Sequence, residues 1–194
     1  MAERRRFELA AGDPRRPLEG RRELAVRLWR VSATRRGSDA SGDSRGLVFE
    51  EFAIGDVHRS KGRTLTEADI AAFAGLSGDF NPLHTDEEYA KATPFRGRIA
   101  HGMLVQSIAT GLANQTLVFD GTTAAVMEMV LKFRTPARAG DTLAIALTVR
   151  EKEAEPGPKR GWVRFGTAIT NQRAEVVCEG EWLLLMLRRR KASE

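Results

Sequence analysis

The chain has 194 residues, of which 42% are hydrophobic and 29% charged, and its formal net charge is +5. This length suits one domain of ordinary size with its own core, and no apolar run reaches the roughly 20 residues that a membrane-spanning helix needs. The single cysteine, Cys178, has no partner within the chain, which excludes a disulfide framework. A reducing compartment, the cytoplasm, is therefore the expected location.

The net excess of positive charge comes from an N-terminal arm, residues 1–45. The arm holds 12 Arg, no Lys and 7 acidic residues, whereas residues 46–194 hold 19 basic and 19 acidic residues. The arm is rich in Arg, Gly and Ser and offers little apolar surface to offset the entropy of ordering, so we predict that it is disordered. A nucleic-acid arm, a membrane-surface arm and a transit-like segment stay open as alternatives. Because the domain itself is charge-neutral, no nucleic acid or membrane is expected as its partner.

The domain is predicted to begin near Leu47 with one or two short edge strands. A helix follows Thr66, which is a good N-cap, and it is expected to end at Gly78. The next stretch, DFNPLH (residues 79–84), is predicted to be an ordered loop, because Pro82 cannot continue a helix.

Two further helices are expected before the strands begin. The first is short and covers residues 85–95, and the second begins at His101 or Gly102. The second segment, "HGMLVQSIATGLANQTLVF", is apolar nearly all round, which is typical of a helix inside a protein. The methionines are expected in the core: Met103, Met127, Met129 and Met186.

After Gly121 the hydrophobic pattern changes to a period of two, which is typical of strands. Four strand-length runs follow, over residues 123–137, 141–154, 160–172 and 174–190. Four successive antiparallel strands behind one buried helix indicate an α+β domain in which a curved sheet wraps around a helix.

The stretch from Phe73 to Gln115 resembles the MaoC-like, (R)-specific enoyl-CoA hydratase family of the hot-dog fold. The resemblance rests on D-x-N-P-L-H at residues 79–84 and I-x-H-G-M at residues 99–103. It implies an α+β hot-dog fold, with an antiparallel sheet around a long central helix, in a homodimer or dimer of dimers with the active site at the subunit interface. The implied enzyme is a hydro-lyase of fatty acid metabolism that interconverts trans-2-enoyl-CoA and (R)-3-hydroxyacyl-CoA. Its substrate would be a CoA or acyl-carrier-protein thioester, and it would need no cofactor.

By this resemblance, Asp79 and His84 form an acid–base pair that acts on one water, and the N–H of Gly102 is an oxyanion donor. Hydration of an unsaturated thioester needs a base, an acid and donors for the developing oxyanion, which suits these residue types. The first N–H groups of a helix have no partner inside it and carry partial positive charge. Asn81 is expected to fix the loop by hydrogen bonds, so that the pair keeps one geometry.

Two other polar residues belong to the same pattern. Thr110 stands where family members often carry a serine, and its methyl group would narrow the space. His101 is expected to orient the site structurally, by helping the helix to start or by contacting a backbone group. A metal site made from Asp79, His84, Asp86 and His101 is not expected, because their spacing fits no recognised ligand pattern.

Two alternative functions stay open. A hot-dog thioesterase would direct a water at the carbonyl carbon, and the acid–base pair within one loop argues against it. A non-catalytic acyl-binding subunit would gain nothing from a matched acid and base. For a site at the dimer interface, the acyl chain is expected near Phe95, Leu104 or Phe133, and the candidate cations for the CoA phosphates are Arg96, Arg98, Lys132 and Arg134.

Overall fold

The computed structural model describes residues 37–38 and 44–189. The predicted disorder of the arm falls on residues that lie almost entirely outside this part of the chain. Within the described part, no helix is long and apolar enough to cross a membrane.

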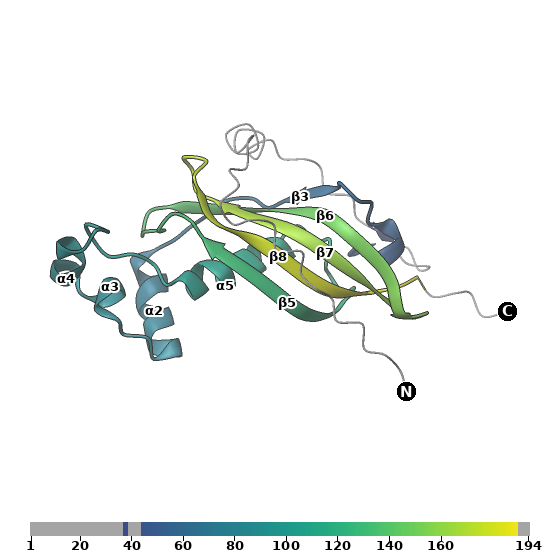
Figure 1. The fold of residues 1–194 in the computed structure, drawn as a ribbon, viewed down its shortest axis with the longest axis horizontal. Helices are drawn as coiled ribbons and strands as arrows, with labels where there is room; N and C mark the ends of the chain where they lie inside the picture. Colours follow the sequence, from purple (N-terminus) through teal and green to yellow (C-terminus); the bar gives the residue numbers. More distant parts are fainter. Residues whose placement is uncertain (1–36, 39–43, 190–194) are drawn as a thin grey trace, which may run out of the picture.

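The elements follow the order expected of the domain, with the helices before the long strands (Figure 1). The short elements come first: β1 (Gly37–Ser38), β2 (Ser44–Arg45), the 3-10 helix η1 (Phe49–Glu51), β3 (Val57–Arg59) and β4 (Arg63–Thr64). The helices are α2 (Glu67–Ser77), α3 (Pro82–Thr85), α4 (Glu87–Ala92) and α5 (Gly102–Asn114). The long strands are β5 (Thr123–Phe133), β6 (Thr142–Gly157), β7 (Arg160–Thr170) and β8 (Val176–Leu187).

The long strands form one antiparallel sheet. Five strands run in the order β3-β6-β7-β8-β5, and β4 also pairs with β6. Because β6, β7 and β8 follow one another in both sequence and space, each pair is joined by a short connection, as the sequence predicts. The ladder between β1 and β2 is separate from this sheet.

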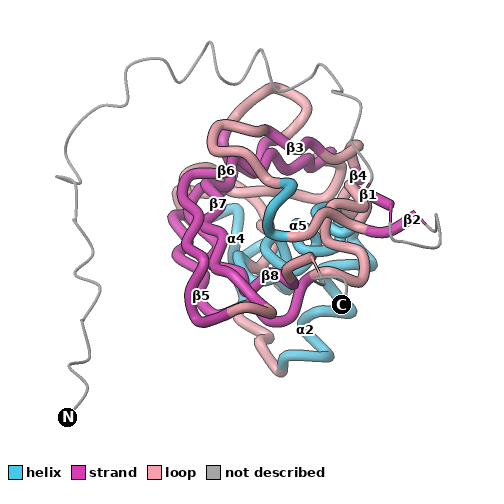
Figure 2. The backbone as a smooth tube through the Cα atoms, turned by 90° about the vertical axis from the view of Figure 1, so that its right-hand side faces the viewer, coloured by secondary structure: helices cyan, strands magenta, loops and turns pink. Residues whose placement is uncertain are grey.

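The core lies between the sheet and α5. Along β7, Val163, Phe165, Thr167 and Ile169 are buried while the residues between them are half-buried, which is the period-two pattern of a strand with one covered face. The small and apolar residues of α5, such as Ala109 and Leu112, belong to the same buried cluster. Figures 1 and 2 show α5 against one face of the curved sheet, which confirms the predicted α+β arrangement.

The structure corrects the prediction for Pro82. Residues 82–84 do not form a loop but begin the short helix α3, with Pro82 in its first turn. The side chain of Asn81 caps this helix by accepting a hydrogen bond from the N–H of Leu83 (3.0 Å). Proline is excluded from the interior of a helix but favoured at its first position, where no N–H is needed, so Pro82 marks the start of a helix here.

The predictions for the methionines hold at Met186, which is fully buried, and at Met129, which packs against the core. They are wrong for Met103 and Met127, which are 55% and 54% exposed. Both lie at the open side of the fold, Met103 on α5 and Met127 on the edge strand β5. An apolar residue at an uncovered edge has no layer above it within one chain, and periodicity alone does not reveal this.

Candidate active site

Helix α2 delivers the chain to Asp79. Thr66 and Asp69 cap its start reciprocally, since Thr66 Oγ1 accepts from the N–H of Asp69 (3.1 Å) and the Asp69 carboxylate accepts from the N–H of Thr66 (2.8 Å). The helix ends at Gly78, whose φ of 75° is the left-handed conformation that glycine adopts readily. One residue earlier, Ser77 Oγ donates to the carbonyl of Phe73 (2.7 Å) and accepts from the N–H of Asp79 (3.2 Å).

Local hydrogen bonds then shape the segment from Asp79 to Thr85. The Asp79 carboxylate accepts from the N–H of Asn81 (3.2 Å), and the Thr85 hydroxyl contacts the carbonyls of Phe80 and Asn81 (3.2 Å each). The N–H of His84 donates to the carbonyl of Asn81 (2.9 Å). Asn81 therefore holds the segment through its side chain, its N–H and its carbonyl, and it does not line the cavity described below.

His84 is half-buried and oriented by a main-chain atom. Its Nδ1 lies 2.8 Å from the carbonyl oxygen of Ile99. A carbonyl only accepts hydrogen bonds, so the hydrogen is assigned to Nδ1, and Nε2 carries the lone pair in the neutral ring. In that tautomer, Nε2 of His84 can accept a proton, while Nδ1 stays bonded to the carbonyl of Ile99.

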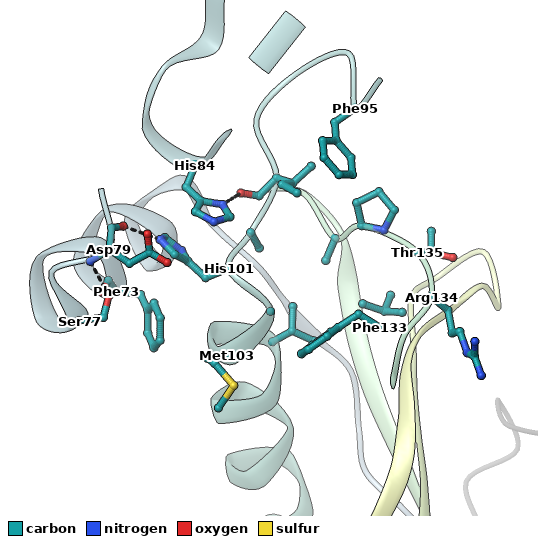
Figure 3. A pocket seen from close by; sticks show the side chains of 17 residues that line it. Phe73, Ser77, Asp79, His84, Phe95, His101, Met103, Phe133, Arg134 and Thr135 are labelled. Atoms are coloured by element: carbon teal, nitrogen blue, oxygen red, sulfur yellow. Dashed lines mark hydrogen bonds between the residues drawn. The ribbon is translucent and has the colours of Figure 1, made fainter. Parts of the chain in front are cut away.

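His101 lies against both members of the predicted pair (Figure 3). Its Nε2 is 2.9 Å from the backbone oxygen of Asp79, and its ring centre is 3.8 Å from that of His84 at an interplanar angle of 31°. One side-chain atom from each of Asp79, His84 and His101 lies within 4.8 Å of the other two. Residues separated by up to 22 positions in the sequence thus form one cluster.

Gly102 is the first residue of α5, with His101 as its N-cap. The N–H of Gly102 has no acceptor inside the helix because of its position. A side chain at this position would collide with Phe133, since an added Cβ would lie 2.8 Å from the tip of its ring. Glycine thus lets α5 start next to β5 without a shift of the Phe133 ring, which an added Cβ would force.

A cavity of about 780 Å³ joins these groups. Its walls come from the ends of α2 and α5, from the segment before α5, from residues 133–137 and from β8. Most of the lining is apolar: Phe73, Phe95, Ile99, Ala100, Met103, Val105, Phe133, Pro136, Ala137 and Val177. Asp79, His84, His101 and Gly102 line the same space, so the cavity presents a small polar cluster in an apolar setting.

Several predicted residues lie elsewhere. Thr110 is outside the lining of the cavity, and its hydroxyl donates to the carbonyl of Ser107 (2.7 Å) on the same helix. Leu104 is buried in the core rather than in the cavity. Phe95 and Phe133 do line the cavity. Sequence reasoning missed Ser77, although its position two residues before an aspartate is a signal for a local side-chain to backbone hydrogen bond.

Two of the four candidate cations, Arg98 and Arg134, already form ion pairs within the chain. Arg98 forms ion pairs with Glu67 (3.0 Å) and Glu87 (3.3 Å), and its backbone N–H and guanidinium hold the pKa of Glu87 below its usual value. Arg134 pairs with Glu179 at 2.8 Å, and Figure 3 shows its side chain turned away from the cluster. Within the described chain, the side chains of Arg96 and Lys132 make no hydrogen bond or ion pair, so these two retain an unpaired charge.

Asp79, His84 and His101 also provide the minimum of three close ligand atoms for a metal ion. Two imidazoles on one tetrahedral ion, with bonds of about 2.0–2.1 Å, would hold their ring centres about 5 Å apart. The rings of His84 and His101 are stacked at 3.8 Å. Asp86 is occupied elsewhere, as the N-cap of α4, where it accepts from the N–H of Tyr89 (3.0 Å). The residues present therefore do not fit a metal ion in this arrangement.

Comparisons with known proteins agree with the geometry. Residues 50–168 match the family model described as a MaoC-like domain. A curated relative, the (R)-specific enoyl-CoA hydratase of Rhodospirillum rubrum, is 39% identical over 133 residues, which cover 69% of this chain and 87% of that protein. The 3-hydroxybutyryl-CoA dehydratase of Methylorubrum extorquens is 32% identical over 148 residues, with 76% and 89% covered.

Solved structures confirm the fold. The unliganded R-hydratase of Pseudomonas aeruginosa superposes with a TM-score of 0.63 at 32% identity, over 77% of this chain and 93% of that one. A Mycobacterium tuberculosis protein described as a double hot-dog fold has a TM-score of 0.66 at 22% identity, over 77% of this chain and 46% of that one. The predicted hot-dog fold is thereby confirmed.

Proposed function

The chain belongs to the MaoC-like domain family, and from that premise we propose that it catalyses the reversible addition of water to a trans-2-enoyl thioester, forming the (R)-3-hydroxyacyl thioester. The observation that carries the proposal is the convergence of Asp79, His84 and the start of α5 on one cavity. The names of the relatives supply the substrate class and the stereochemistry, and the cluster supplies the groups that such a reaction needs.

In the proposed reaction, one water lies between the Asp79 carboxylate and the Nε2 lone pair of His84. Its oxygen bonds to carbon 3 of the enoyl group, one of its protons passes to the pair, and carbon 2 receives a proton from the pair. The negative charge that develops on the thioester oxygen is stabilised by the N–H of Gly102 at the positive end of α5. No metal or cofactor takes part.

The substrate has room in the cavity. An apolar acyl chain would contact Phe95 and Phe133, which line its walls. The phosphates of CoA, or the phosphate that links an acyl group to an acyl carrier protein, would meet unpaired positive charge from Arg96 and Lys132. We place the reaction in the cytoplasm, because the single thiol, Cys178, is buried and unpaired.

The assembly we propose is a homodimer, alone or as half of a dimer of dimers. The edge strand β5 offers unpaired backbone groups, and exposed Val126, Met127 and Phe133 lie along it. An edge of this kind is a liability unless it is covered, and a second copy would cover it. Thr110 lies on α5 outside the cavity of its own chain, so its proposed orienting role requires the dimer.

A first experiment mixes the purified protein with crotonyl-CoA and follows the enoyl-thioester absorbance and free thiol together. The proposal expects the absorbance to fall without thiol release, and the product to be the R isomer. Thiol release would instead identify a thioesterase. Tight binding of the thioester with no change in either signal would identify a non-catalytic acyl-binding subunit.

A further inference from the structure

His101 occupies a position that the proposed reaction does not explain. It is 3% exposed and precedes Gly102 directly, yet as the N-cap of α5 it makes no side-chain capping bond. An N-cap side chain ordinarily accepts a hydrogen bond from the first turn of its helix. The imidazole of His101 points instead toward the segment that carries Asp79 and His84 (Figure 3).

The first contact of this ring is with the backbone of Asp79. Nε2 of His101 donates to the carbonyl oxygen of Asp79 over 2.9 Å, which assigns the hydrogen of the neutral ring to Nε2. The backbone N–H of Asp79 donates to Ser77 Oγ (3.2 Å). Both polar backbone groups of Asp79 are thus held, one by α2 and the other by α5. Without these two bonds, only the exposed turn formed with Asn81 would fix the position of Asp79.

The second contact is with the ring of His84. The two rings stack with centres 3.8 Å apart, while Phe73 packs on His101 with its ring centre 5.1 Å away. His84 is held from its other side by the carbonyl of Ile99. The plane of the His84 ring is therefore fixed between a main-chain acceptor and the imidazole of His101.

We propose that His101 is a positioning residue that sets the distance between the Asp79 carboxylate and the His84 imidazole, and sets both relative to the adjacent Gly102 N–H. The inference rests on the proposed function. The buried ring of His101 contacts the backbone of Asp79 and stacks on the ring of His84, and the main chain of His101 is joined to Gly102 by a peptide bond. Misplacement of reacting groups by about 1 Å can cost about 100-fold in rate, so the loss of this ring should reduce kcat more than it changes KM.

Two substitutions separate the two contacts. His101→Phe keeps a flat ring against His84 but removes the N–H that holds Asp79. His101→Gln can keep an N–H donor for the Asp79 carbonyl but removes the stacked ring. Each is expected to lower kcat about 10- to 100-fold with KM changed less than threefold. His58→Phe is the matched control: His58 is a half-buried histidine on β3 against Phe52, away from the cavity, and its replacement should leave kcat within twofold.

A second measurement does not depend on any substrate. Amide hydrogen exchange is followed over residues 79–85 in the full chain and in each variant. His101→Phe should speed exchange in this segment at least tenfold, whereas His58→Phe should not. If the protein proves to have no hydratase activity, the proposed function fails while the exchange result still decides the role of His101.

The inference is overturned if folded His101→Phe retains wild-type kcat, or if exchange over residues 79–85 is unchanged. A loss in kcat that comes with an equal rise in KM also overturns it, because that pattern indicates substrate binding instead of positioning. If the Phe variant fails to fold, the Gln variant is judged by the same two measurements. Ser77→Ala, which removes the other hold on Asp79, should then show a smaller loss of kcat in the same direction.

Discussion

Replacing Gly102 with alanine tests how closely α5 must approach β5 for the site to work. The added Cβ would lie 2.8 Å and 2.9 Å from two carbons of the Phe133 ring, whereas ordinary contact begins at 3.4 Å. The ring therefore has to move by about 0.6 Å, or α5 has to move by the same distance, if neither atom is compressed. The displaced atoms line the cavity beside the proposed oxyanion donor.

The expected cost lies in catalysis and not in folding. Phe133 is 51% exposed, so its ring can swing away at little cost in stability, and alanine is a better helix former than glycine by about 0.5–1 kcal/mol. We expect Gly102→Ala to change the melting temperature by less than about 3 °C. A displacement of this size should lower kcat/KM by about 10- to 100-fold, which corresponds to about 1.4–2.7 kcal/mol.

The assay is hydration of crotonyl-CoA in a double-mutant cycle. Phe133→Leu removes the ring atoms that the new Cβ would strike, so Gly102→Ala should cost less than threefold when it is introduced into the Phe133→Leu protein. Equal losses in the two backgrounds would refute the reasoning, because the cost of the methyl group would not come from Phe133. Full activity of Gly102→Ala on its own would also refute it.

Three further predictions follow from other contacts. Asp79→Asn and His84→Ala should each lower kcat at least 100-fold. The melting temperature should change little, because neither side chain is buried in the core. Retained turnover in either variant would remove that residue from the mechanism. The Arg45 guanidinium holds the pKa of Glu51 at about 2, below its ordinary value of 4.5. This carboxylate therefore contributes at most about 3 kcal/mol to the free energy of unfolding. The contribution is present above about pH 5 and is lost as the pH falls toward 2. The urea midpoint of Glu51→Gln should accordingly be lower than that of wild type at pH 7, and the two midpoints should converge only as the pH approaches 2. A constant gap would contradict the assignment. Gly180→Ala places a Cβ 1.8 Å from a carbonyl oxygen of β5, so it should cost about 3 kcal/mol or more and lower the melting temperature by roughly 6–12 °C; an unchanged melting curve would show that β5 and β8 are not paired as described.

The sequence predicts the strands and helix starts well where a single local rule decides them. The change to a period of two after Gly121 places β5 to β8, because alternation along a strand depends only on which face is covered. The start of α5 at Gly102 follows from the change at His101 to an apolar run. The prediction for Pro82 failed because the same residue either ends or begins a helix, and only the capping bond of Asn81 decides between the two.

The arrangement of the candidate site is less accessible from sequence. The order Asp79, Asn81, His84 marks a polar segment, but the contact between Asp79 and His101 spans 22 positions and depends on how α2 packs beside α5. Which ring nitrogen of each histidine donates depends on a carbonyl supplied by a distant segment. The exposure of Met103 follows from the open side of the fold, which no periodicity within one helix can report.

The support of His84 by a main-chain oxygen has a consequence for engineering the substrate range. The carbonyl of Ile99 orients the histidine, while the side chain of Ile99 lines the cavity wall. Every amino acid supplies the same carbonyl, so position 99 can be varied to reshape the space for the acyl chain without replacing the group that orients the base. A library of substitutions at this position would separate selectivity for acyl-chain length from catalytic activity. These two properties usually change together when a pocket is redesigned.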